Sequence, residues 1–157
     1  MKDAASRTRN AFFLAMIVIF VAIALAIFEI IRLPWAVIGG LAIALVILSV
    51  ALVVLTARLG EPRRRKTVFM LTGLSAVAIP VCAVLHNLVY ALCIVLFGEE
   101  FWGEGGDEPV FFILAVIVCP AVFLTSATIG VILLLKGRMA EKKAEHGEES
   151  EPADVEK

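Results

Sequence analysis

The sequence predicts an all-α integral membrane protein: a bundle of four transmembrane helices with both termini in the cytoplasm. Of its 157 residues, 61% are hydrophobic and 18% are charged, and the mean hydropathy is +0.99. Soluble domains are about 45–50% apolar and about 25% charged. The apolar residues also form four long runs, whereas a soluble helix needs a polar face. The predicted parts are a cytoplasmic N-terminal segment (1–10), a transmembrane domain (11–137) and a charged, disordered cytoplasmic tail (138–157).

The first span is predicted over residues 11–28, which carry no charge. Such a run is about long enough to cross a hydrocarbon layer of roughly 30 Å. Basic residues precede it, so a cleaved signal peptide is the alternative. The run is longer than the usual apolar region of about 7–15 residues in a signal peptide, and no polar mature start follows it. We therefore expect a retained helix.

A connection of only six residues, 29–34, leads to the second span, predicted over residues 35–57. So short a connection makes the two helices antiparallel neighbours. Pro34 is compatible with this, because proline is tolerated at the start of a helix. Glu29 and Arg32 are three residues apart at the outer edge, so we expect a local ion pair between them.

The loop 58–66 holds five basic residues and one acid. The excess of positive charge in cytoplasmic loops predicts that this loop lies inside the cell. A patch for lipid phosphates or nucleic acid is the alternative interpretation. Orientation alone explains the cluster, so no nucleic-acid partner is expected.

The third span, 68–97, is uncharged over 30 positions and would be about 45 Å long as a straight helix. Tilt, projection beyond the membrane or a bend at Pro80 must absorb the excess length. The loop 98–109 carries five carboxylates and no basic residue. We expect it to be a solvated outer connector and not a cation site. The fourth span, 110–135, contains Pro120 and is followed by basic residues.

The charges of the connections are mutually consistent with a cell-membrane location and cytoplasmic termini. The basic loop and the basic end of the fourth span then lie inside, and the acidic loop lies outside. Trp35 and Trp102 fall at the outer interface, where amphipathic rings are favoured.

Small and polar residues recur at helical spacing within three of the spans and predict the faces through which the helices pack. These faces carry Ala15, Ala22, Ala26 and Glu29 in the first span, Ala42, Ser49 and Thr56 in the second, and Cys119, Ser126 and Gly130 in the fourth.

The candidate intramembrane polar site is centred on His86, because an ionisable group at membrane depth is costly and often functional. Its other members are Cys82, Asn87, Tyr90 and Cys119. We expect a neutral His86 that is hydrogen-bonded to Asn87, Tyr90 or a polar group of another span.

Two other roles remain open for this site. One is a metal or haem site that uses His86 with Cys82, Cys93 or Cys119; the other is a proton or substrate path. The chain has no Cys-x-x-Cys signature and no second intramembrane histidine, so neither metal nor cofactor is expected.

The sequence contains no motif for nucleophilic, acid–base or phosphate chemistry, and its segments outside the spans are too short for a catalytic domain. The leading hypothesis is therefore a non-enzymatic structural or accessory subunit that sits in the lipid bilayer and forms a homo-oligomer or part of a larger membrane complex. A small oligomeric transporter or channel, using His86 and the prolines Pro80 and Pro120, is the first alternative. A metal- or haem-binding redox subunit is the second.

Overall fold

The described residues, 2–103, 106 and 108–148, fold into helices joined by short connections in this computed structural model. In chain order these are α1 (Lys2–Ile27), α2 (Trp35–Arg58), α3 (Arg63–Phe97), a 3₁₀ turn η1 (Glu99–Trp102), α4 (Pro109–Ile113), a π-helical segment η2 (Leu114–Val118) and α5 (Cys119–Glu148). The segments α4, η2 and α5 follow one another without a break and form the fourth helix.

The prediction of an all-α fold with four membrane-length helices is confirmed. The four apolar helices long enough to cross a membrane are Ala4–Ile27, Trp35–Arg58, Arg63–Phe97 and Pro109–Ala140. The helices run past the predicted spans at the two ends of the chain, because α1 begins at Lys2 and α5 continues to Glu148. The rest of the tail predicted to be disordered, residues 149–157, lies outside the described residues.

The first helix ends in a hydrogen-bonded C-cap. Ile30 N donates to Leu25 O at 2.9 Å and Glu29 N donates to Ala26 O at 3.1 Å, which is the Schellman pattern. Glu29 takes the left-handed position of this motif, with φ 57°, where glycine is more usual. The cap turns the chain sharply, so that α2 starts after Pro34 as predicted.

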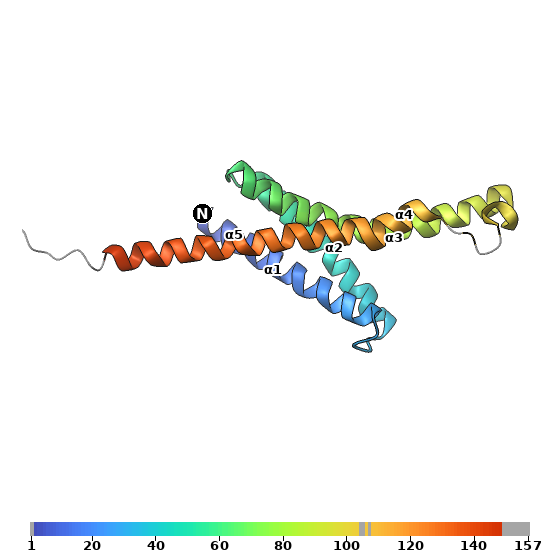
Figure 1. Cartoon of the computed structure of the whole chain (residues 1–157), viewed down its shortest axis with the longest axis horizontal. Helices are drawn as coiled ribbons and strands as arrows, with labels where there is room; N and C mark the ends of the chain where they lie inside the picture. Colours follow the sequence, from blue (N-terminus) through green and yellow to red (C-terminus); the bar gives the residue numbers. More distant parts are fainter. Residues whose placement is uncertain (1, 104–105, 107, 149–157) are drawn as a thin grey trace, which may run out of the picture.

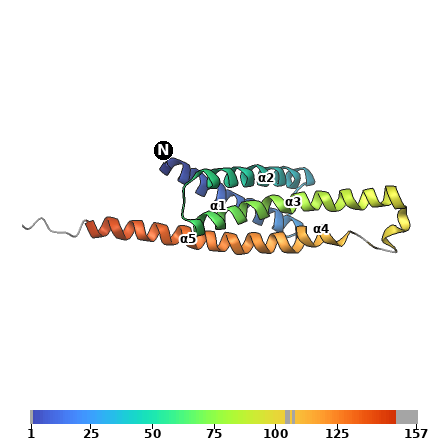
Figure 2. The same ribbon diagram turned by 90° about the horizontal axis from the view of Figure 1, so that it is seen from above.

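The helices form two antiparallel pairs that cross. Figure 1 shows α3 and the fourth helix side by side along the long axis, with the α1–α2 hairpin running obliquely across them. Figure 2 shows α2 and α5 on opposite sides of α3. Successive contacts join α1 to α2, α2 to α3 and α3 to α5.

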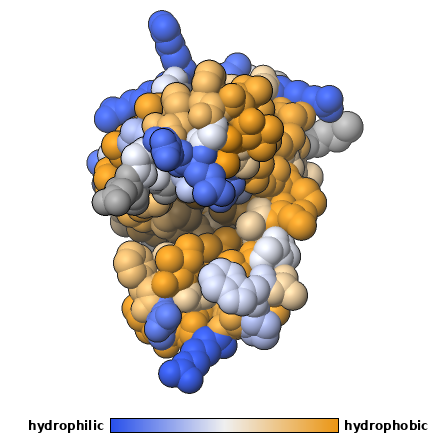
Figure 3. All heavy atoms as spheres, turned by 90° about the vertical axis from the view of Figure 1, so that its right-hand side faces the viewer, coloured by the Kyte–Doolittle hydropathy of each residue, from blue (hydrophilic) through white to orange (hydrophobic). Residues whose placement is uncertain are grey.

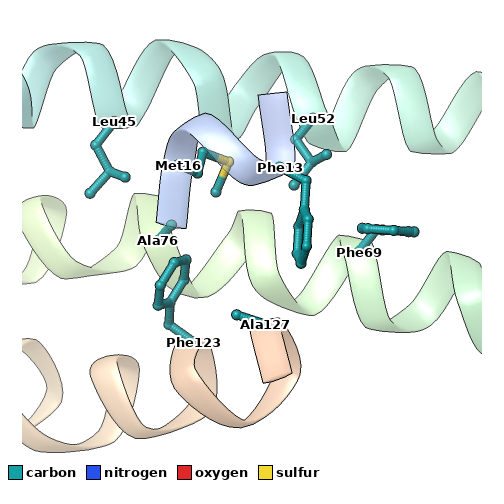
Figure 4. Packing of buried hydrophobic residues seen from close by; sticks show 8 residues of the cluster. All are labelled: Phe13, Met16, Leu45, Leu52, Phe69, Ala76, Phe123 and Ala127. Carbon is teal, nitrogen blue, oxygen red and sulfur yellow. The ribbon is translucent and has the colours of Figure 1, made fainter. Parts of the chain in front are cut away.

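The buried core lies where the two pairs cross, and all four spans contribute to it (Figure 4). Its fully buried members are Phe13, Met16, Leu45, Leu52, Phe69, Ala76, Phe123 and Ala127. The Phe13 and Phe69 rings meet edge to face, with centroids 5.0 Å apart. Such edge-to-face contact is a favoured geometry for aromatic pairs.

The predicted packing faces of the second and fourth spans are confirmed. Ser49 and Thr56 of α2 are fully buried, and Ser126 of α5 receives a hydrogen bond of 3.0 Å from Thr72 of α3. Gly130 lies beneath the Phe13 ring, where an added Cβ would come within 2.6 Å of the ring. Small residues here let the backbones approach closely, as is typical of membrane helices.

The helix of the third span extends well past the α1–α2 hairpin at one end (Figure 1). The helix α3 is continuous across Pro80 and has 35 residues, about 52 Å at about 1.5 Å per residue. Figures 1 and 2 show that the far end of α3 and the adjoining part of the fourth helix extend well beyond the α1–α2 connection.

The fourth helix changes its hydrogen-bond pattern just before Pro120. Proline has no N–H to donate to the carbonyl four residues back, which is that of Val116. At the residue directly before it, just after η2, Cys119 N donates to Leu114 O, five residues back. A single π-helical turn is a common way to accommodate such an interruption.

An apolar groove opens where the two helix pairs diverge. It has a volume of about 410 Å³ and is lined by Phe20, Ile23, Ala24, Ile27, Phe28, Ile38, Ala42, Leu45, Ile79, Pro80, Ala83, Ala115, Val116 and Pro120. Figure 3, which looks from the projecting end of α3, shows a hollow with largely hydrophobic walls between the two pairs.

Candidate functional site

The bundle has two chemically different ends. The acidic end carries η1 and the residues before α4, where Glu99, Glu100 and Glu108 lie. The basic end carries the start of α1, the start of α3 and the part of α5 near Arg138, and residues of all three line one cavity there. The three basic segments therefore share one end, as the sequence predicts.

At the acidic end, Glu108 caps the fourth helix. Its carboxylate accepts hydrogen bonds from Val110 N at 2.9 Å and Phe111 N at 2.8 Å, and Pro109 occupies the first helical position. These are backbone donors that have no partner inside the helix. The Glu108 residue is only 4% exposed, so this carboxylate is buried, in contrast to the solvated connector predicted for the acidic loop.

His86 of α3 contacts the same residue. Its Nδ1 lies 3.0 Å from Glu108 O and 3.5 Å from Glu108 Oε2. Because a carbonyl oxygen only accepts, Nδ1 carries the proton and donates to it. The His86 ring also packs against Phe112, with centroids 5.6 Å apart. His86 thus joins α3 to Glu108, a residue of the predicted loop 98–109 that directly precedes the fourth helix.

The other residues of the predicted site are divided among different contacts. Asn87 is exposed and donates to Ala83 O at 2.8 Å, one turn back on α3. Tyr90 stacks on Trp102 of η1, with centroids 6.2 Å apart. Neither residue is the hydrogen-bond partner that the sequence suggested for His86.

The cysteines form a separate contact one turn deeper. Cys119 of the fourth helix lies beside Cys82 of α3, and both are free thiols. Cys93 is also free and half-buried. Among the described side chains of residues 4–103, 106, 108–140 and 143, no three from His, Cys, Asp or Glu lie where they could hold one metal ion.

His86 lies far along α3 from the basic start of the helix. Arg65 and His86 are separated by 21 residues of continuous helix, about 31 Å at about 1.5 Å per residue. This length is close to the thickness of the hydrocarbon core of a bilayer, about 30 Å.

Glu29 and Arg32 line one shallow hollow with Trp35 at the α1–α2 connection. Both residues are exposed. In the part of the chain that the structure describes, no ion pair joins their charged groups. The hollow has a volume of about 390 Å³ and is open to solvent.

A second polar cluster, which sequence reasoning missed, lies at the basic end. The Arg9 side chain is fully buried and forms an ion pair with Glu61 of the α2–α3 connection. Arg9 Nη2 also donates a hydrogen bond to Asn10 Oδ1 at 2.7 Å. The guanidinium carbon lies 4.4 Å from the centroid of the Phe69 ring. A charged group can be buried in this way because it is paired and packed against an aromatic face.

Two signals in the sequence could have indicated these clusters. Glu61 is the only acid in a strongly basic loop, which suggests a specific partner. Glu108 directly precedes Pro109 at the head of an apolar run, and this pattern is typical of a helix N-cap followed by proline at the first position.

The first prediction concerns the cap. Glu108→Ala removes two hydrogen bonds to backbone N–H groups and a contact of His86, so the free energy of unfolding should fall by about 1–2 kcal/mol. Glu99→Ala, a matched change at an exposed glutamate of the same end, should have little effect. Thermal unfolding in detergent micelles measures both, and amide exchange should quicken at Val110 and Phe111. Equal stability of the two variants would contradict the assigned role.

The second prediction concerns the buried ion pair. Arg9→Leu or Glu61→Leu alone leaves one charge unpaired and should lower the unfolding free energy by about 3 kcal/mol. The double variant should be more stable than either single one, because no unpaired charge remains. Arg7→Leu, at an exposed neighbour, is the control. Additive losses in the double variant would show that the two side chains do not interact.

The two clusters hold helices together through the contacts of Arg9 with Glu61 and of His86 with Glu108. The fold alone does not determine the function, which depends on the chemistry of the chain's own sites and surfaces. Comparison with protein-family models, with curated proteins and with solved structures found no significant match for this chain.

Proposed function

We propose that this chain is a non-enzymatic, multi-pass cell-membrane protein that acts as a structural or accessory subunit by associating with another membrane chain. The observation that carries this proposal is the apolar groove between the α1–α2 hairpin and the α3–fourth-helix pair. All four spans contribute to its walls, so the groove is a property of the whole bundle.

The groove has the chemistry of a helix-packing surface. Every residue that lines it is apolar, and four of them are alanines, Ala24, Ala42, Ala83 and Ala115. Small residues let a neighbouring backbone approach, which is how membrane helices associate when lipid tails offer no hydrophobic driving force. Its volume is about 410 Å³.

The chain by itself covers little of its apolar surface. Only 17% of the most apolar 18-residue window is buried inside the protein for each of the first two spans. A transmembrane helix of a second copy or of another subunit would place side chains into the groove. Without such a helix, lipid tails fill the groove.

A small oligomeric transporter is the second candidate. One observation favours it: Pro80 and Pro120 both line the groove, and η2 lies directly beside it. Interrupted helices of this kind border substrate sites in transporters. The apolar walls suit an apolar cargo rather than an ion, and His86 lies outside the groove.

The third prediction tests the groove. Ala83→Leu should reduce the recovery of the partner chain in mild detergent at least fivefold, because the larger side chain occupies the space. Ala91→Leu, an exposed position on the same helix that does not line the groove, should leave the recovery unchanged. A photo-crosslinker at position 83 should capture the same chain, and one at position 91 should not.

Equal recovery with both variants, or a wild-type chain that is monomeric and captures no protein, would exclude the subunit role. Reconstituted liposomes then test the second candidate. Uptake of an apolar dye above empty vesicles, lost in Ala83→Leu, would favour transport.

We also propose that both termini lie in the cytoplasm. The grouping of the three basic segments at one end and the acidic loop at the other supports this orientation, because positive residues are retained on the cytoplasmic side.

The fourth prediction tests this orientation with single cysteines introduced into a variant whose native cysteines are replaced by alanine. Glu99→Cys should react with a membrane-impermeant maleimide in intact cells. Arg64→Cys should react only after permeabilisation, because it lies on the inner side. The reverse pattern would place the termini outside.

A further inference from the structure

A second cavity, of about 480 Å³, lies at the basic end between three helices. It is lined by Ser6, Arg7 and Asn10 of α1, Arg65 of α3, and Leu134, Gly137 and Arg138 of α5. Three of these residues are arginines, each from a different helix. We call this cavity the basic pocket. It is remote from the apolar groove, which lies toward the acidic end.

Three arginine side chains give the walls of the basic pocket a positive charge. Glu61 forms an ion pair with Arg9, and one of its oxygens lies 3.9 Å from Arg65 Nε. Among the side chains that the structure describes, those of residues 4–103, 106, 108–140 and 143, no ion pair involves Arg7 or Arg138 and no acidic residue lines the pocket. Three like charges around one cavity repel one another, so a bound anion there relieves the repulsion.

The donors of the pocket match a phosphate group. Arginine presents a planar fork of N–H donors that fits two phosphate oxygens at once. The Ser6 hydroxyl and the Asn10 amide add neutral hydrogen-bonding groups to the wall. A metal cation does not suit this pocket, because its arginines are positively charged and carboxylate ligands for a cation are too few there.

The position of the pocket identifies the source of the phosphate. Leu134 lies one helical turn from Arg138 toward the apolar part of α5, so the wall changes from charged to apolar along the helix axis. A phospholipid has the same order of groups, with its phosphate at the membrane surface and its acyl chains beneath. Basic pockets between membrane helices are known binding sites for anionic headgroups.

We propose that the basic pocket binds the phosphate of an anionic phospholipid from the leaflet at the basic end of the bundle. Arg7, Arg65 and Arg138 contact the phosphate oxygens, and the glycerol and first carbons of the acyl chains lie along Leu134. This proposal does not depend on a partner chain or on which side of the membrane the termini occupy.

The experiment uses the purified full chain in a neutral detergent and native mass spectrometry to measure bound lipid. The probes are dioleoyl phosphatidylglycerol, dioleoyl phosphatidylcholine with the same acyl chains, and inorganic phosphate alone. The pocket variant is Arg7→Gln with Arg138→Gln. The matched control is Arg64→Gln with Lys136→Gln, which removes the same charge at two exposed positions that do not line the pocket.

The wild-type chain should bind phosphatidylglycerol at least tenfold more tightly than phosphatidylcholine. Each pocket arginine should contribute about fivefold, so the pocket variant should bind at least tenfold more weakly. The control should change binding by less than about threefold. Helical content and thermal unfolding check that each variant is folded, and Arg138→Gln alone replaces the pocket variant if that variant is not.

Equal losses in the pocket variant and the control would overturn the proposal, because diffuse surface charge would then explain the binding. Equal binding of the two lipids would also overturn it. Displacement of phosphatidylglycerol by an equal concentration of inorganic phosphate would show that the pocket takes free phosphate and would overturn the assignment to a lipid.

Discussion

The buried guanidinium of Arg9 is the constraint on which the arrangement of the helices depends. An unpaired charge removed from water costs several kcal/mol, so Arg9 can be buried only where Glu61 and the Phe69 ring reach it. This requirement ties α1 to the α2–α3 connection at one point. One turn further along α1, Phe13 contacts Phe69 and covers Gly130, so the fourth helix joins the same cluster.

Helices that are held together near one end and cross at an angle must separate toward the other. The apolar groove follows from this geometry and from the small residues on its walls, with no polar group needed to form it. Past the crossing, α3 and the fourth helix remain paired by different means. Glu108 caps the fourth helix and contacts His86, and Tyr90 of α3 stacks on Trp102. The acidic end is thus held by local hydrogen bonds and aromatic contacts, and the basic end by a long-range ion pair.

The periodic and compositional signals predicted the helices well, because a membrane span must be apolar along most of its length. The packing faces at Ser49, Thr56, Ser126 and Gly130 followed from the same logic. The partners of individual charges could not be predicted, since Arg9 and Glu61 are 52 residues apart and their contact depends on how two hairpins cross. For the same reason the sequence indicated that His86 needs a polar partner, with Asn87, Tyr90 or another span as candidates, but did not identify Glu108.

The π-helical turn at Leu114–Val118 has a geometric consequence for the whole fourth helix. Such a turn holds one more residue than an α-helical turn, so it rotates the following residues by about 100° relative to an uninterrupted helix. Glu108 contacts α3 on one side of this turn, and Cys119 contacts Cys82 of the same helix on the other. The turn therefore sets which of the residues after it, Cys119 and Ser126 among them, face α3. Deleting any single residue from this turn would therefore rotate the part of the helix after it by about 100° relative to the part before it, so that only one of the two parts could keep its present face toward α3.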